Sequence, residues 1–386
     1  MRDLRHIDRF WRVILLGLVL SSSGLLAQKA KNTNENPIVL GLLLEDSIQV
    51  EARYGARFAV DEINRKGGLS GRSIELNIKS MEGPWGVGSK QAVDLVFDQE
   101  AWALIGLLNG RNSHLVEQVA AKTDVPFVSA WAADPTLAKA YVPQFFNIVP
   151  NSEQQVTALL DEMIKIRGLD KWLLVSDNTY DEEIAVKSLK NQELFREKPP
   201  LDQILFDTSG GFESFGTSDS SEEFEVLLQT IQKTEPEALL ALCDPEFTLS
   251  LAESLRSRGM QVPVYSGFNL LHEATFSSLI SDQLPGVHFV NVGNWIEDRH
   301  SDFVKGFFNE YGRYPGVMSA LAYDAVQLLV QAISESGMNP KKLKQSLSEI
   351  SYSGKTGSFE FDHHGNRSSD TPIAVFNFGN LSASER

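Results

Sequence analysis

The chain has 386 residues, of which 42% are hydrophobic and 22% are charged. This composition is typical of globular proteins and argues against a disordered chain or a bundle of membrane-spanning helices. The formal net charge of −16 at pH 7 argues against nucleic acid or anionic lipid as the main partner, because both are negatively charged. The length accommodates two ordinary domains, each with a sizeable core.

Residues 1–27 have the three parts of a secretory signal peptide. The basic start contains Arg2, Arg5, Arg9 and Arg12. An apolar stretch over 13–20 and a short segment that ends in Ala27 follow, as in cleaved export signals. An uncleaved anchor is the alternative, but the 15 residues from 13 to 27 are fewer than the roughly 20 that a membrane-spanning helix needs. We therefore expect cleavage and a periplasmic location.

Cysteine usage indicates a protein that is held together by its core. The chain has one cysteine, Cys243, so no internal disulfide forms even though an oxidising compartment would permit one. Cys243 follows the apolar run 238–242. We expect it to be a small buried residue at the end of a strand.

From residue 38 onward, short apolar runs alternate with amphipathic stretches of helical period. Strands are predicted at 38–44, 74–78, 102–107 and 126–129, and helices at 51–66, 89–98 and 112–122. Strands that alternate with helices of about ten residues indicate βαβ units and a parallel sheet covered on both faces.

The same pattern restarts after Asn151. Strands are predicted at 171–176, 203–206, 238–242, 262–266 and 287–292. Helices are predicted at 152–167, 181–194, 222–233, 245–258, 301–311, 320–336 and 340–348. Residues 209–221 have the composition of a surface loop, and 358–362 and 373–378 are predicted to be two strands joined by a polar loop. The fold class is therefore α/β, with two doubly wound units in series.

Catalytic and metal-binding motifs fail on spacing. The stretch 83–90 has the glycine spacing of a phosphate loop, but its last two residues are in reversed order. Gly354-Lys355-Thr356 has the right ending for such a loop, but Glu349 stands where its first glycine should be. His363-His364 has no third ligand nearby, so a solvated turn is favoured over a metal site. Acidic pairs such as Asp181-Glu182 lie at predicted helix starts, where they complement the helix dipole. We expect no enzyme, no cofactor and no metal.

Polar and aromatic residues directly after the predicted strands are better candidates for a site. In parallel α/β sheets, ligands bind where the carboxyl ends of strands meet helix N-termini. Seven strand ends carry such residues, at 45–47, 83–85, 109–113, 130–134, 177–180, 244 and 268–269. This arrangement suits recognition of a small molecule. The alternative for Asn112, Asp134 and Asp181 is that each only caps a helix.

Several motifs in order resemble the type I periplasmic binding proteins, specifically the branched-chain amino-acid family of ABC importers. They are the helix 54–64 with its glycine turn 67–72, the segments 104–106, 125–129 and 134–135, the late helix segment 322–326, and 357–365 near the end. The resemblance covers about 38–378. It implies two lobes joined by a hinge with three crossovers, with 37–150 and 293–352 in lobe 1 and 151–292 and 353–386 in lobe 2.

The positions after the predicted strands, together with the resemblance, indicate which residues bind the ligand. They are Ser47, Trp85, Asn109, Gly110, Arg111, Asn112, Ser113, Trp131, Ala132, Ala133, Tyr180, Asp244, Phe268 and Asn269. Gly110 falls where the family has a serine for the ligand carboxylate, and Phe268 falls where it has an acid for the ligand ammonium. These departures favour a flat aromatic or less charged ligand, with Arg111 available for a carboxylate. An amino acid remains the alternative if Asp244 faces the cleft.

The resemblance implies a solute-binding component of an ABC importer. It would bind a small molecule that is amino acid-like, an amide or an aromatic carboxylate between its lobes as a monomer. It would deliver this ligand to a permease in the inner membrane, without nucleic acid or cofactor. The alternative is a ligand-sensing module of the same fold in a signalling or regulatory system.

Overall fold

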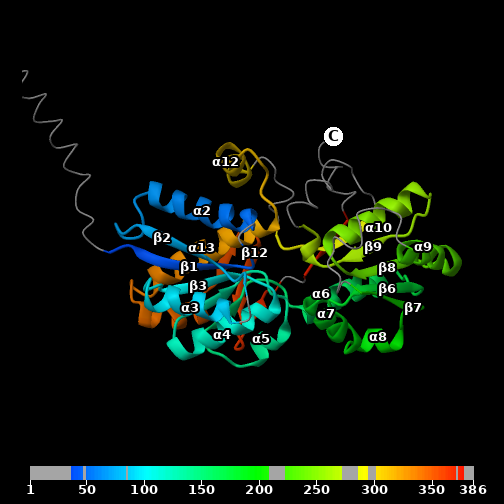
Figure 1. The fold of residues 1–386 in the computed structure, drawn as a ribbon, viewed down its shortest axis with the longest axis horizontal. Coiled ribbons are helices and arrows are strands. Elements are labelled where there is room, and N and C mark those ends of the chain that lie inside the picture. Colours follow the sequence, from blue (N-terminus) through cyan, green and yellow to red (C-terminus); the bar gives the residue numbers. More distant parts are fainter. Residues whose placement is uncertain are drawn as a thin grey trace, which may run out of the picture.

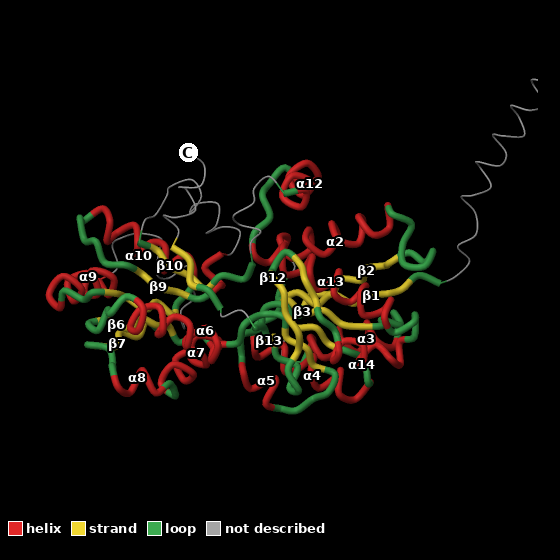
Figure 2. The backbone as a smooth tube through the Cα atoms, turned by 180° about the vertical axis from the view of Figure 1, so that it is seen from behind, coloured by secondary structure: helices red, strands yellow, loops and turns green. Residues whose placement is uncertain are grey.

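The computed structural model describes residues 36–46, 49–83, 86–207, 222–271, 286–293, 301–370 and 373–377. The predicted signal peptide and the predicted loop 209–221 lie outside these residues. The described chain forms two parallel sheets side by side, each covered by helices (Figure 1). Seen from behind, the two sheets again lie at opposite ends of the long axis (Figure 2).

The first sheet has five strands in the order β2-β1-β3-β4-β5, and all its neighbours run parallel. The strands are β1 Ile38–Leu44, β2 Ile74–Ser80, β3 Ala103–Leu107, β4 Phe127–Ser129 and β5 Phe145–Asn147. The helices around it are α2 Val50–Arg65, α3 Val87–Phe97, α4 Gly110–Thr123, α5 Pro135–Lys139 and α13 Val317–Glu335. The buried strand β1 is apolar at nearly every position because helices pack on both faces of the sheet.

The second sheet repeats this order in six strands, β7-β6-β8-β9-β10-β14. The strands are β6 Trp172–Asp177, β7 Asp202–Phe206, β8 Ala238–Leu242, β9 Val264–Ser266, β10 Val287–Val290 and β14 Val375–Asn377. The helices are α6 Ser152–Leu160, a π-helical turn η2 Asp161–Ile166, α7 Tyr180–Lys190, α8 Glu193–Glu197, α9 Glu222–Thr234, α10 Pro245–Ser257 and a 3-10 turn η4 Phe268–Leu271. β14 alone is antiparallel. Both sheets therefore reverse their strand order beside the first strand, at β1 and at β6.

The chain passes between the sheets three times, after β5, after β10 and after β13. On its return it forms α12 Asp302–Tyr311, α13, the 3-10 turn η6 Pro340–Lys342 and α14 Leu343–Glu349. A three-stranded antiparallel sheet follows, made of β11 Tyr352–Gly354, β12 Gly357–Phe361 and β13 Arg367–Ser368.

The C-terminal segment differs from its prediction. We expected 353–386 to lie wholly in lobe 2 and its two strands to be joined by a loop. β14 does pair with β10 of the second sheet, but β11 and β12 pack against α13 and α14. A buried polar contact explains this placement, because the Asp324 carboxylate on α13 accepts hydrogen bonds from Tyr352 Oη at 3.0 Å and Thr356 N at 2.6 Å.

Helix α13 packs along α2 in the core of the first lobe. It is long and apolar enough to cross a membrane, yet 78% of its most apolar window is buried inside the molecule, as expected of a core helix. The two helices approach so closely at Gly55 that a Cβ there would lie 2.1 Å from the Ser319 carbonyl oxygen. Only glycine allows this backbone contact.

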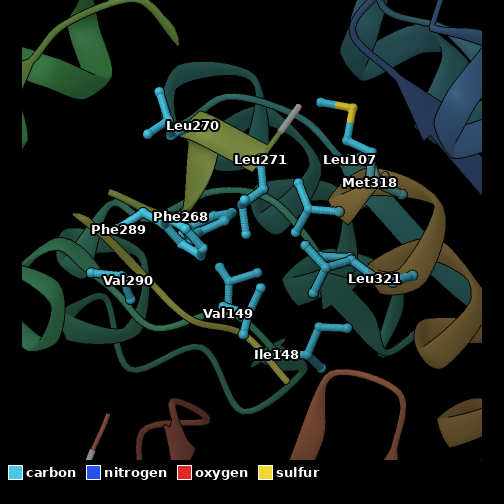
Figure 3. Close-up of a cluster of buried hydrophobic side chains, with 14 of the residues drawn as sticks. Leu107, Ile148, Val149, Phe268, Leu270, Leu271, Phe289, Val290, Met318 and Leu321 are labelled. Carbon is cyan, nitrogen blue, oxygen red and sulfur yellow. The ribbon is translucent and has the colours of Figure 1, made fainter. Parts of the chain in front are cut away.

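Apolar side chains from both lobes form one buried cluster at the junction of the lobes. Leu107 from β3 and Met318 and Leu321 from α13 lie opposite Phe268 of η4 and Phe289 of β10 (Figure 3). Ile148 and Val149, in the first crossing segment, complete the cluster. Because these residues are buried together, the two lobes share one continuous apolar core at their junction.

Candidate functional site

A cavity of about 360 Å³ lies between the two sheets, at the carboxyl ends of their strands. Its apolar lining includes Trp131 and Ala133 after β4, Met318 on α13, and Phe268 after β9. Its polar lining consists of Ser152, Gln155, Asp177, Thr179, Asp181, Glu182, Asp244, Glu246, Ser266 and Asn269. Residues from both lobes enclose a volume that suits a small organic molecule.

Two carboxylates are placed by the ends of β6 and β8. Asp177 Oδ1 accepts hydrogen bonds from Thr179 N at 3.0 Å and Thr179 Oγ1 at 2.6 Å, and its Oδ2 accepts one from Asp244 N at 2.8 Å. Asp244 Oδ1 caps α10 by accepting from Glu246 N at 2.8 Å and Phe247 N at 3.2 Å. Burial raises the pKa of Asp244 in spite of these bonds.

Two further carboxylates come from the first turn of α7. Glu182 Oε1 accepts one hydrogen bond, from Asn269 Nδ2 at 3.1 Å. Burial raises the pKa of Glu182 well above its usual value, and the neighbouring charges of Asp177 and Asp181 raise it further. Together with Glu246, the four carboxylates form what we call the acidic wall: Asp177, Asp181, Glu182, Asp244 and Glu246.

Asp181 reaches across the cleft to the first lobe. Its Oδ1 accepts a hydrogen bond from Gly110 N, in the first turn of α4, at 2.9 Å. Burial raises the pKa of Asp181 to about 6, although the Gly110 bond opposes the shift, and repulsion from Asp134 and Glu45 adds to it. A carboxylate from the second lobe thus occupies the positive end of a first-lobe helix.

Asp134 forms a second contact across the cleft. Its Oδ2 accepts a hydrogen bond from Tyr180 Oη at 2.9 Å and lies 3.3 Å from His114 Nε2. Its Oδ1 accepts from Thr136 N at 2.8 Å and Thr136 Oγ1 at 2.7 Å. The ring of His114 also lies 3.2 Å from Glu117 Oε2 through Nδ1. We call this group the Asp134 cluster.

The charged groups of the Asp134 cluster shift each other's pKa values. Burial alone would raise the pKa of Asp134, but hydrogen bonds from His114, Thr136 and Tyr180 outweigh it and lower the pKa to about 2. Hydrogen bonds to Asp134 and then Glu117 raise the pKa of His114 to about 9. His114 is therefore a cation at neutral pH, between two carboxylates.

Two aromatic rings that line the cavity, one from each lobe, are in contact. The rings of Trp131 and Phe268 lie 5.2 Å apart at 82°, in an edge-to-face arrangement. Gln155 holds the segment of Phe268, because its Oε1 accepts a hydrogen bond from Phe268 N at 3.2 Å while its Nε2 donates to Pro150 O at 2.8 Å. One aromatic ring from each lobe thus faces the same space.

Five of the predicted ligand-binding residues line the cavity: Trp131, Ala133, Asp244, Phe268 and Asn269. Seven do not line it: Asn109, Gly110, Arg111, Asn112, Ser113, Ala132 and Tyr180. Ser47 and Trp85 lie outside the described residues. Residue-level binding roles stay predictions.

Internal contacts explain why several predicted residues do not face the cavity. The Glu45 carboxylate accepts hydrogen bonds from Asn109 Nδ2 at 2.8 Å and from Asn112 Nδ2, so both amides serve the first lobe. Asn109, rather than Asn112, caps α4. Arg111 lies over the Tyr180 ring, 5.3 Å from its centre. Ser113 and Ala132 are fully buried.

Of the five carboxylates of the acidic wall, only Asp244 was among the predicted ligand-binding residues. Asp181 and Glu182 were explained by the dipole of α7, and they do lie in its first turn. Their side chains nevertheless line the cavity. Ser152, Gln155, Ser266 and Met318 also line it and were not predicted as ligand-binding residues. Within residues 36–377, leaving out the undescribed gaps, no three His, Cys, Asp or Glu side chains are grouped as metal ligands.

The fold and cavity define a two-lobed ligand-binding protein, and comparison with known proteins agrees. Residues 52–376 match the family model described as the receptor family ligand binding region. The chain therefore belongs to that family. Glutamate receptor 3.7 of Arabidopsis thaliana is 30% identical over 113 residues, which make up 29% of this chain and 12% of the receptor.

Solved structures share the fold at low sequence identity. The branched-chain amino acid transporter substrate binding protein LivJ from Streptococcus pneumoniae, in complex with isoleucine, is 20% identical, with 88% of this chain and 99% of that chain covered at a TM-score of 0.71. A solute binding protein of an ABC transporter from R. palustris, in complex with benzoate, is 19% identical, with 88% and 96% covered at a TM-score of 0.70. The predicted α/β fold with parallel sheets is confirmed.

Proposed function

We propose that this protein is the solute-binding component of an ABC importer and traps a small molecule between its lobes. The observation that carries the proposal is the cavity at the carboxyl ends of strands from both sheets, with Trp131 from one lobe and Phe268 from the other. Structural neighbours described as transporter substrate-binding proteins support it. Binding there would favour a closed arrangement, because only that arrangement lets the ligand contact both lobes.

Lobe 1 would comprise 37–150 and 293–352 together with the three-stranded sheet that packs on α13 and α14. Lobe 2 would comprise 151–292 and β14. The signal peptide 1–27 would export the protein to the periplasm. There it would act as a monomer and hand its ligand to a permease, without binding nucleic acid.

Binding without chemistry agrees with the composition of the cavity. Its lining holds the hydroxyls of Ser152, Thr179 and Ser266, but none of the described lining residues is a histidine, lysine or cysteine that would activate them. Ser152 Oγ donates to the Ala133 carbonyl at 2.9 Å, and Thr179 Oγ1 donates to Asp177. The hydroxyls of Ser152 and Thr179 therefore have structural roles.

Two measurements test the proposal. We expect a ligand from a small-molecule screen to raise the melting temperature of the mature protein by mass action and to reduce its radius of gyration in X-ray scattering. The ligand should be recovered unchanged after prolonged incubation. Conversion of the ligand to a product, or a screen in which no compound shifts the melting temperature, would contradict the proposal.

A sensor of the same fold is the second candidate, favoured by the match to a plant glutamate receptor and by the receptor family model. Both functions need the same ligand-induced closure. They differ in the partner, so the ligand-bound protein should stimulate ATP hydrolysis by a reconstituted permease complex only in the importer. Stimulation of a sensor kinase instead would favour the second candidate.

A further inference from the structure

We propose that the ligand is a small organic cation without a carboxylate, whose ammonium group lies against Glu182, Asp181 and Asp244 while its apolar part packs on Trp131 and Phe268. This inference rests on the proposed function, because it takes the cavity to be the ligand site. It replaces the expectation of an aromatic carboxylate that the sequence favoured.

The lining of the cavity is negatively charged. The acidic wall contributes five carboxylates, and none of the described lining residues is a lysine, arginine or histidine. Glu182 accepts a single hydrogen bond, from Asn269. Burial and mutual repulsion raise the pKa values of Asp181, Glu182 and Asp244. A cation that enters the cavity would relieve this repulsion, whereas a carboxylate would add to it.

The N-terminus of α4, which could bind a ligand carboxylate, is already occupied by Asp181. Helix α4 begins at Gly110, and the N-terminus of a helix attracts anions. Asp181 fills this place by accepting the Gly110 N–H at 2.9 Å. Space is also lacking, since a Cβ on Gly110 would lie within 2.9 Å of both Asp181 Oδ1 and Tyr180 Cε1. A ligand carboxylate would have to displace the protein's own.

Independent evidence for a ligand comes from Ser266. This residue is only 2% exposed, lines the cavity, and its hydroxyl has no hydrogen-bond partner in the described part of the chain. A buried hydroxyl that borders a cavity is normally paired. An ammonium or hydroxyl group of a bound ligand would complete its hydrogen bonding.

The aromatic rings fit the same ligand class. Trp131 and Phe268 border the acidic wall and lie edge to face at 5.2 Å. Aromatic faces attract ammonium groups and also pack on apolar carbon. The carboxylates are not grouped as metal ligands within the described chain, and the volume of about 360 Å³ exceeds that of a bare ion. An organic cation uses both the charge and the volume.

A matched series of probes tests the charge preference. Benzylamine, benzyltrimethylammonium, benzyl alcohol and benzoate share one ring and differ in charge, and isoleucine adds a zwitterion. We expect the two cations to bind at least tenfold more tightly than benzyl alcohol in calorimetry, and benzoate and isoleucine more weakly still. Tighter binding of benzoate or isoleucine would overturn the inference and leave the proposed function standing. Binding of no compound in this series or in a general screen would overturn both.

Variants of α7 locate the cation. Glu182→Gln should weaken binding of benzyltrimethylammonium at least tenfold and raise the melting temperature of the free protein, because it removes a buried, repelled charge. Glu183→Gln, on the exposed side of the same helix, is the control and should change neither. Asp244→Asn gives a second test, since asparagine still caps α10. Unchanged affinity in both Glu182→Gln and Asp244→Asn would overturn the inference.

Discussion

Asp134 contacts the second lobe through Tyr180, and Glu182 lines the cavity between the lobes, yet the surroundings of the two carboxylates differ. Asp134 accepts hydrogen bonds from two atoms of Thr136 and from Tyr180, and lies beside the cationic His114. Its pKa falls to about 2 although burial opposes this. Glu182 has one donor, Asn269, and its pKa rises through burial and the nearby carboxylates. Paired charges stabilise the fold, whereas unpaired charges destabilise it and are free to bind a partner.

The largest effect on stability should come from Asp134→Ala. The substitution leaves the half-buried His114 without one of its two carboxylate partners and removes the cap of α5. We expect a loss of about 3 kcal/mol, since breaking a buried pair is costly. Asp134→Asn is the control for the cap, because asparagine also caps helices, and it should recover about 1 kcal/mol. Chemical denaturation measures both. Equal losses would show that the cap contributes nothing, and full recovery in Asp134→Asn would show that only the cap matters.

Asp181→Asn should remove part of the pH dependence of stability. The pKa of Asp181 is about 6 in the folded protein against an ordinary 3.8, so between about pH 4 and pH 6 the folded state keeps a proton that the unfolded chain has released. Stability therefore falls as pH rises through this window, by at most about 3 kcal/mol. Above pH 6 the variant should be the more stable protein.

Asp134 provides the contrast in the same titration. Its pKa is about 2, so its stabilisation is present above pH 4 and is lost as pH falls towards 2. His114, with a pKa of about 9, stabilises fully below about pH 6.5 and loses this contribution as pH rises through 9. Urea denaturation between pH 2 and pH 10 separates the three groups. An Asp181→Asn curve parallel to that of the unsubstituted protein would contradict the prediction.

Gly110→Ala should weaken the contact between α4 and α7. A Cβ at this position would lie 2.8 Å from Asp134 Cβ and 2.9 Å from Asp181 Oδ1, so the two lobes must move apart. We expect a larger radius of gyration in scattering and a loss of about 1–3 kcal/mol, as for other overpacked sites. An unchanged radius of gyration would show that the lobes are held by the apolar core behind the cleft instead.

Much of the fold was predictable because its strands are buried on both faces. Runs such as β1 and β8 are almost wholly apolar, and the helices between them carry apolar faces. The three-residue strand β5 was not predicted. The late strands were joined wrongly because contacts between distant residues, such as those of Asp324 with Tyr352 and Thr356, place β11 and β12 on α13, and such contacts have no local signal in the sequence.

The site was predictable to the extent that strand ends determine it. That rule brought Trp131, Asp244 and Phe268 to one cavity. It could not show that Glu45 would occupy the amides of Asn109 and Asn112, because the partners are more than sixty positions apart. Nor could a helix start distinguish acids that only complement the dipole from acids that line a cavity, since both roles use the same first turn.

The smallest effect should come from Tyr180→Phe, which separates the Asp134 cluster from ligand binding. The substitution removes the hydrogen bond from Tyr180 Oη to Asp134 Oδ2 at 2.9 Å, so we expect a loss of about 1 kcal/mol. The pKa of Asp134 should rise, and acid unfolding should begin at higher pH. Ligand affinity should stay within twofold, because Tyr180 does not line the cavity. Tyr141→Phe, at an exposed ring, is the control. A tenfold loss of affinity without a change in stability would instead place Tyr180 in the binding surface, as the sequence alone had predicted.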